Sequence, residues 1–191
     1  MVENKNKKSK YVFVNIKNGQ EKVLEFFNDL FNMEYKQIEN EYYLYQLFSD
    51  EEIELEEIID SLNVDFGENI KVFESNYLNK EEDVFKLFDI YKRNNKHSYS
   101  NISKLVIDIN NKEDLKKLRE ITLYKVGKDN DLINIVIAMY KNDLNVSKTA
   151  SAVYMHRNTV NNKLEIIKKS SGLDIQRFYD AIAMYKLMYN K

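Results

Sequence analysis

Between residues 11 and about 95, the apolar residues alternate between the two-residue period of a strand and the three-and-four spacing of a helix. The order that results is β-α-β-β-α-β-α, which predicts a split βαβ domain of ferredoxin-like topology. Such a domain is expected to have one antiparallel sheet with helices on one face. The predicted elements are strands at 11–16, 34–38, 41–48 and 69–74, and helices at 20–32, from the cap residues Ser49 and Asp50 to Leu62, and from Lys80 onward.

The residue types that are missing exclude several kinds of site. The chain has no cysteine, which removes disulfides, iron–sulfur clusters, thiolate zinc and thiol catalysis, and its two histidines, His97 and His156, are too far apart in sequence to favour a metal site. The four glycines at 19, 67, 127 and 172 are too dispersed for a phosphate-binding loop. We therefore predict a protein that is not an enzyme and needs no metal or cofactor.

The start of the chain is polar and lysine-rich, without the apolar region of a signal peptide. No stretch approaches the roughly 18 uncharged apolar residues that span a bilayer. The sequence therefore predicts a cytoplasmic protein that makes no use of a membrane.

Charge is distributed unevenly along the chain. Residues 131–191 contain nine Lys or Arg against five Asp or Glu, a net charge of +4, whereas the whole chain has a net charge of −2. An acidic larger part is thus followed by a basic smaller part. This asymmetry is typical of a protein in which one segment meets a polyanion, although scattered surface charge can also produce it.

The basic segment is predicted to be helical throughout, with closely spaced breaks. A helix from 131 to 141 is followed by a short one at 145–153, a turn at Tyr154-Met-His156 and a longer helix from Arg157 to Lys169. Ser170, Ser171 and Gly172 then end this helix with a glycine cap. Two helices joined by a tight turn are a helix-turn-helix.

The longer helix has one apolar and one polar face. Val160, Leu164 and Ile167 fall together at 100° per residue and are expected to pack. On the opposite face, asparagine suits adenine, arginine suits guanine, and lysine suits phosphate. The candidate DNA-binding residues are Ser147, Lys148, Thr149, His156, Arg157, Asn158, Thr159, Asn161, Asn162, Lys163 and Lys168. Each also has a structural interpretation, as a cap, a packing residue or a solvated charge.

The run Asn145-Val-Ser-Lys-Thr-Ala-Ser-Ala-Val-Tyr-Met-His-Arg-Asn-Thr-Val160, with Lys163-Leu164 and Gly172-Leu-Asp174, resembles the C-terminal DNA-binding domain of PucR/CdaR-type bacterial transcriptional regulators. Its order is also similar to the helix-turn-helix of Fis. Family members commonly have Tyr-Arg where this chain has Asn162-Lys163, so that a cation remains but a bidentate fork is lost. The N-terminal sensor usual in the family is not found.

The preceding strand and helix order resembles the degenerate GGDEF-like domain that often lies before this domain. That resemblance places residues 34–48 at the hairpin of a GGDEF domain. The tip, Glu39-Asn40-Glu41, lacks the glycine pair that would let a nucleotide phosphate approach the backbone. Cyclase activity is therefore not expected.

These observations predict an α+β protein with a GGDEF-like split βαβ domain followed by an all-α helix-turn-helix domain. The expected function is sequence-specific regulation of transcription on double-stranded DNA by a homodimer, with a protein or small-molecule effector acting on the N-terminal domain. The alternative is a non-enzymatic signalling or protein-interaction module with a degenerate helix-turn-helix. The predicted boundaries are a disordered tail at 1–10, the first domain at 11–96, a linker with two short helices at 97–130, and the DNA-binding domain at 131–191.

Overall fold

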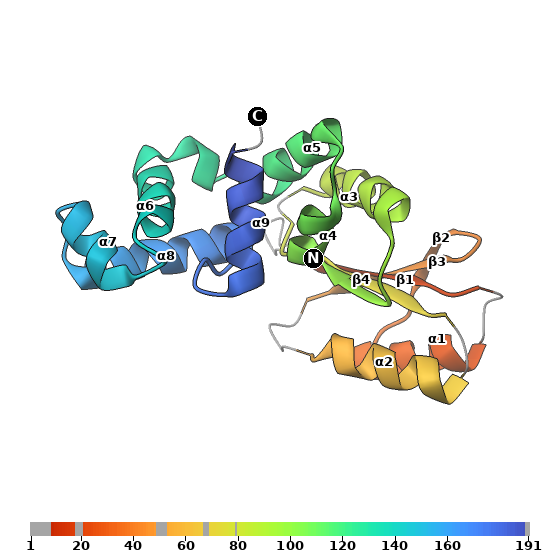
Figure 1. The fold of residues 1–191 in the computed structure, drawn as a ribbon. Coiled ribbons are helices and arrows are strands. Elements are labelled where there is room, and N and C mark those ends of the chain that lie inside the picture. The colour runs from red at the N-terminus through yellow and green to blue at the C-terminus, as the bar shows by residue number, and fades with distance from the viewer. Residues whose placement is uncertain (1–8, 18–20, 49–52, 67–68, 79, 190–191) are drawn as a thin grey trace, which may run out of the picture. The chain divides into compact units, whose positions relative to one another are not determined.

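The computed structural model describes residues 9–17, 21–48, 53–66, 69–78 and 80–189 (Figure 1). The chain divides into two compact units, Met1–Leu105 and Val106–Lys191. This division falls inside the segment 97–130 that was predicted as a linker. The predicted cap at Ser49 and Asp50 and the first eight residues of the predicted tail lie outside the described residues.

The N-terminal unit confirms the predicted order of strands and helices. Its first strand begins at Lys10, one residue earlier than predicted, and a further short strand follows the last predicted helix. The elements are β1 (Lys10–Asn15), α1 (Glu21–Phe31), β2 (Lys36–Glu39), β3 (Tyr42–Leu47), α2 (Leu55–Phe66), β4 (Lys71–Glu74), α3 (Glu82–Asn94) and β5 (Tyr99–Asn101).

The five strands form one sheet in the order β2-β3-β1-β4-β5. The central strand β1 is antiparallel to both of its neighbours, β3 and β4, as the split βαβ arrangement requires. Strand β5 pairs with β4 in parallel, so the prediction of a wholly antiparallel sheet is wrong at this edge. A strand of three residues is too short to show a two-residue period, which is why the sequence pattern did not reveal it.

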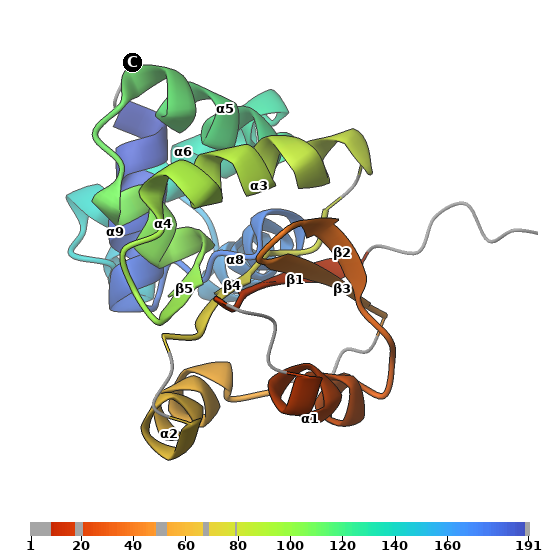
Figure 2. The same ribbon diagram turned by 90° about the vertical axis from the view of Figure 1, so that its right-hand side faces the viewer.

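Helices cover both faces of this sheet, which corrects the prediction that they lie on one face. Figures 1 and 2 show α1 and α2 on one side of the strands and α3 on the other. On the first side, Val12 and Val14 join the apolar core that α1 and α2 complete. On the second side, the Phe13 ring packs against Phe88 and Tyr91 of α3, with ring centroids 5.4 and 6.1 Å away. Successive residues of β1 therefore serve two separate apolar layers.

The C-terminal unit is helical, as predicted for residues 131–191. Two short helices precede that segment and agree with the two predicted within 97–130. The first, α4, crosses the division between the units. The elements are α4 (Ile102–Asp108), α5 (Lys112–Thr122), the 3-10 helix η1 (Val126–Lys128), α6 (Asn130–Lys141), α7 (Val146–Ala152), α8 (Arg157–Ser171) and α9 (Phe178–Tyr189).

Helix ends in this unit are set by side chains that the sequence places at caps. The Asp129 carboxylate accepts the backbone N–H groups of Asp131 and Leu132 at the start of α6. The Asn145 side chain accepts the Lys148 N–H at 3.0 Å and so begins α7. Gly172, with a φ of 72°, ends α8 in the left-handed region, which confirms the predicted glycine cap.

The turn between α7 and α8 holds a tyrosine in a backbone conformation that suits glycine. Tyr154 has a φ of 55°, and its side chain is 98% exposed. A turn of this kind often contains glycine, but Val153, Tyr154, Met155 and His156 offer none. A bulky residue at positive φ is strained by contact between its Cβ and the backbone. Because the ring is exposed, packing does not offset this strain.

The two faces of the sheet provide a matched pair of buried tyrosines for a stability test. None of the described residues forms a hydrogen bond with the Tyr91 hydroxyl, whereas the Tyr45 hydroxyl lies 3.1 Å from the Asn28 side chain. Burial raises the pKa of both hydroxyls, which is the same desolvation that makes an unpaired hydroxyl costly. We expect Tyr91→Phe to raise the free energy of unfolding by about 1 kcal/mol and Tyr45→Phe to lower it by about 1 kcal/mol. Urea denaturation measures both, and equal losses in the two variants would contradict the assignment.

The strain at Tyr154 makes a second prediction about stability. Replacing Tyr154 with glycine removes the Cβ at a positive φ, and we expect a gain of about 1 kcal/mol after the extra entropy of glycine in the unfolded chain is subtracted. Tyr154→Ala is the control, because alanine removes the exposed ring but keeps the Cβ. Thermal and chemical denaturation should show stabilisation in the glycine variant alone. A similar gain in both variants would attribute the effect to the ring instead of the backbone.

Candidate nucleic-acid interface

Helices α7 and α8 form the helix-turn-helix that the sequence predicted, and α6 packs against both of them (Figure 1). Val160, Leu164 and Ile167 of α8 are all buried, which confirms the predicted apolar face. Ala150 of α7 is buried as well, where its small side chain lets the two helices approach closely. The orientation of α8 about its own axis is therefore fixed by packing.

The opposite side of α8 is exposed along most of its length. The start of the helix presents Arg157, Asn158, Asn161 and Asn162, all exposed. Within the part of the chain that the structure describes, none of these four side chains forms a hydrogen bond or an ion pair. They are thus available to an external partner without the loss of an internal contact. Thr159, Glu165 and Lys169 are also exposed on this helix.

His156 both caps α8 and remains exposed. Its Nδ1 accepts the backbone N–H of Asn158 at 3.2 Å, so this ring nitrogen acts as the N-cap acceptor. In this tautomer the proton of the neutral ring lies on Nε2, which can donate to an oxygen outside the domain. The sequence offered capping and phosphate contact as alternatives, and the geometry is compatible with both at once.

The lysines predicted to contact phosphate are each paired with an aspartate of the same unit. Lys163 donates to Asp131 at 2.9 Å and is only 20% exposed, so it ties α8 to the first turn of α6. The other two pairs are Lys148 with Asp143 at 3.4 Å and Lys168 with Asp174 at 3.1 Å. The aspartates are the residues that the sequence analysis missed. Their separations from the lysines along the chain do not match the three-and-four spacing of a helix, so the sequence pattern does not reveal the pairs.

Two other predicted residues lie in different surroundings. Ser147 is exposed at the start of α7, next to Lys148. Thr149 has no exposed surface, and its hydroxyl has no hydrogen-bond partner among the described residues. This burial removes the Thr149 side chain from the surface that the sequence analysis assigned to DNA. The reason is that α7 turns this position toward the helix core, although threonine is a polar residue.

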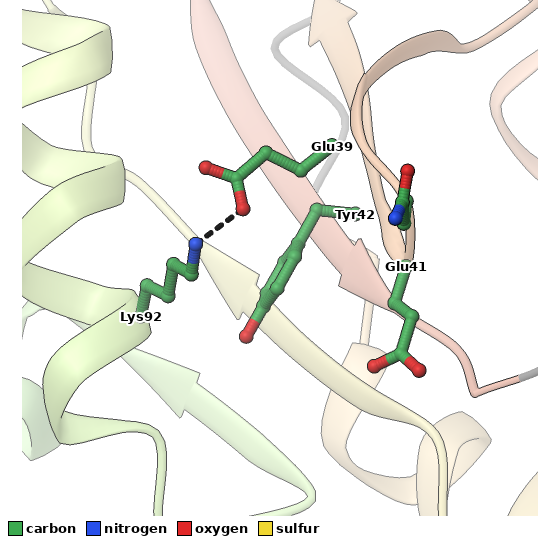
Figure 3. A pocket seen from close by; sticks show the side chains of 5 residues that line it. Glu39, Glu41, Tyr42 and Lys92 are labelled. Atoms are coloured by element: carbon green, nitrogen blue, oxygen red, sulfur yellow. Dashed lines mark hydrogen bonds and ion pairs between the residues drawn. The ribbon is translucent and has the colours of Figure 1, made fainter.

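A hollow in the N-terminal unit lies at the tip of the β2–β3 hairpin and is a second candidate site. Figure 3 shows its lining of Glu39, Glu41 and Tyr42 from the hairpin and Lys92 from α3. The volume of the hollow is about 470 Å³. Lys92 forms an ion pair with Glu39, and this hydrogen bond raises the pKa of the lysine. Two carboxylates against one amine leave a negative lining, which repels a phosphate. The structure therefore gives this hollow no feature of a nucleotide site.

The described residues form neither a metal site nor a membrane-spanning helix. Among the described residues, no group of three or more histidine, cysteine or acidic side chains is arranged to hold a metal ion. Within the same ranges, every helix is too short or too polar to cross a membrane.

Comparison with known proteins agrees with the geometry of α6 to α9. Residues 132–186 match the family model of the PucR C-terminal helix-turn-helix domain. A solved structure, described as the regulator of polyketide synthase expression from Bifidobacterium adolescentis, is 12% identical, with a TM-score of 0.47 over 96% of this chain and 80% of that one. No curated protein matches the sequence. The C-terminal part of the chain, at residues 132–186, is thus a helix-turn-helix domain of the PucR type.

Proposed function

We propose that this protein is a sequence-specific DNA-binding regulator of transcription that reads the major groove with α8. The observation that carries this proposal is the group of four exposed side chains at the start of α8. Arg157, Asn158, Asn161 and Asn162 lie on a helix whose opposite face is firmly buried, and they keep no internal partners among the described residues. Recognition helices commonly reach base edges with their N-terminal residues.

The chemistry of these side chains suits base edges. The guanidinium of Arg157 can donate two hydrogen bonds to O6 and N7 of guanine, and an asparagine amide can pair with N6 and N7 of adenine. In this proposal Asn158, Asn161 and Asn162 select adenine or contact the backbone nearby. His156 and Thr159 flank them and donate to phosphate, which fixes the register of the helix on the duplex.

The paired lysines fit this proposal if phosphates replace the aspartates. Lys148 and Lys168 are exposed, and an exposed lysine–carboxylate pair contributes only about 0–1 kcal/mol, so the exchange of one anion for another costs little at these two positions. Lys148, Lys163 and Lys168 would then contact the DNA backbone from α7 and α8. Their aspartates would lower the affinity for DNA of any sequence, because each phosphate contact has to displace a carboxylate first.

The same pairs are the observation that favours the alternative function. A helix-turn-helix whose lysines are neutralised internally has a weaker positive face than DNA binding usually requires. The alternative is a non-enzymatic module that binds a protein through this domain. A DNA-binding measurement separates the two functions. A regulator would bind DNA in a salt-sensitive and sequence-specific way, whereas a protein-binding module would show neither property.

The N-terminal unit would carry regulation in this proposal. Its sheet order is that of a split βαβ domain, and the negative hairpin tip is consistent with a GGDEF-like domain that has no nucleotide chemistry. We assign it the role of receiving a protein or small-molecule signal in the cytoplasm. Two recognition helices, about 34–36 Å apart on one face of the duplex, would give a dimer its specificity.

Arg157→Ala tests direct readout. We expect binding to the preferred duplex to weaken by about 5- to 150-fold, the equivalent of roughly 1–3 kcal/mol for a bidentate contact, with little change for unrelated DNA. Selection from pooled genomic duplexes gives the preferred site, and fluorescence anisotropy then gives both affinities. Arg177→Ala is the matched control, since Arg177 is an exposed arginine of the same unit outside α7 and α8. Equal losses in both variants, or no enrichment by the wild type, would contradict direct readout by α8.

Asp131→Asn tests the exchange of carboxylate for phosphate at Lys163. The substitution frees the lysine, and we expect binding to tighten by about threefold at low salt, with a steeper dependence on salt concentration. The double variant with Lys163→Ala is the control, because it keeps the removal of the carboxylate but also removes the lysine. If Asp131→Asn tightens binding equally in the presence and absence of Lys163, the effect comes from general charge and this pair is not involved.

A further inference from the structure

Helix α9 has two apolar sides, and the fold of its own unit covers only one of them. The inner side contributes Ala181, Ala183, Met184 and Leu187 to the core. The outer side carries Phe178, Ile182, Tyr185 and Tyr189, which are between 38% and 71% exposed, and Tyr179 lies beside them. Spacings of four, three and four place these outer residues in one stripe along the helix. An apolar helix face of this length is typical of an interaction surface.

The outer stripe is ordered by contacts within the unit. Tyr185 stacks on Tyr189, with ring centroids 4.5 Å apart, and both rings meet Tyr140 of α6 edge to face. The Tyr140 hydroxyl in turn donates to the Ala181 carbonyl in α9. Rings that are already held in place lose little conformational entropy when a partner binds.

A hollow lies beside the C-terminal end of the same helix. Its volume is about 440 Å³, and Met188 and Tyr189 of α9 form one wall. Ile133 and Ile137 of α6 belong to its mostly apolar lining. The stripe of α9 thus has a large protruding ring, Phe178, at its first residue and an apolar hollow at its last.

We infer that α9 is the dimerisation helix and that it packs antiparallel against α9 of a second copy of this chain. A two-fold axis between Ala183 and Met184 places Ile182 of each copy against Tyr185 of the other. The same axis places Phe178 of each copy beside Tyr189 and the hollow of the other. Because the stripe has the protruding Phe178 ring at one end and a hollow that can receive it at the other, the stripe can pair with a second copy of itself, as a two-fold interface requires. The antiparallel helix dipoles also attract each other.

The available area is sufficient for such a dimer. Five large side chains of roughly 150–250 Å² each, weighted by their exposed fractions, offer about 500 Å² per copy. Two copies would then bury about 1,000 Å², which is roughly the area that a specific interface has to exceed. Insertion of Phe178 into the hollow adds the apolar surface of Ile133, Ile137 and Met188.

This dimer extends the proposed function and rests on it. Two recognition helices can bind one DNA site only if the two copies are held together. Helix α9 begins just beyond the C-terminal end of α8, whereas Arg157 lies at the N-terminal end, about 21 Å away along the helix axis. Figure 1 shows α7 and α9 at opposite ends of α8. Pairing through α9 therefore leaves the DNA-facing residues of both copies uncovered.

Sedimentation of the full chain, with charges placed across the two-fold axis, tests this inference. We expect the wild type to be a dimer, and Ile182→Lys and Tyr185→Glu each to weaken dimerisation by roughly tenfold or more. An equimolar mixture of these two variants should form a heterodimer, because the new ammonium group at position 182 of one copy then faces the new carboxylate at position 185 of the other. Val64→Glu is the control, since Val64 is an exposed apolar residue of α2. Circular dichroism confirms that each variant is folded.

Three outcomes would overturn the inference: a monomeric wild type, dimerisation unaffected by either single variant, or a mixture that fails to associate. A monomer would indicate that the stripe binds something other than a second copy of this chain. DNA binding by the same samples keeps the two proposals apart. A monomeric wild type that still binds a single half-site overturns only the α9 pairing, whereas a wild-type dimer that the α9 variants disrupt but that ignores DNA overturns only the proposed function.

Discussion

The burial of three aliphatic side chains on α8 determines what this helix offers to a partner. Val160, Leu164 and Ile167 have between 0 and 6% exposure, and each contributes about 1.5–3 kcal/mol when it leaves water. Rotation of the helix by one residue would expose at least one of them, at a cost comparable to a large part of the stability of a small domain. The packing of the opposite face therefore keeps Arg157 and the three asparagines exposed, without any contact made by these side chains themselves.

The tight turn before α8 transmits the same constraint to α7. A helix-turn-helix changes direction within three or four residues, in a turn that often contains glycine. Here Tyr154 takes the left-handed conformation that suits glycine, and its ring lies in solvent. The strain is tolerated because the helices on both sides are anchored by Ala150 and Val160. Packing on either side of the turn thus maintains a backbone that the tyrosine itself disfavours.

The sequence predicted those features that depend on local periodicity or on a cap. The strand order, the helix-turn-helix with the helix that precedes it, and the glycine cap at Gly172 all belong to this class. The sequence did not predict features that depend on residues far apart in the chain. The second helix layer follows from Phe13 in a strand that alternates between two apolar sides, and β5 is visible only through its pairing with β4. Likewise, the sequence of α8 alone suggests a solvated Lys163, because the partner of this lysine, Asp131, lies 32 residues earlier in the chain.

The net charge of +4 at residues 131–191 already includes the aspartate partners, and the ion pairs show where on the surface the positive charge is cancelled. A net positive charge suggests strong attraction to DNA, but three of the lysines assigned to phosphate already have an anion nearby. The remaining attraction per copy is modest, so one recognition helix would hold DNA weakly. Linking two such helices makes the second contact intramolecular and multiplies the affinity without any new contact. In the proposed dimer, weak charge on each domain and the pairing of two domains would be complementary, because specificity would then depend on Arg157 and the asparagines more than on phosphate attraction.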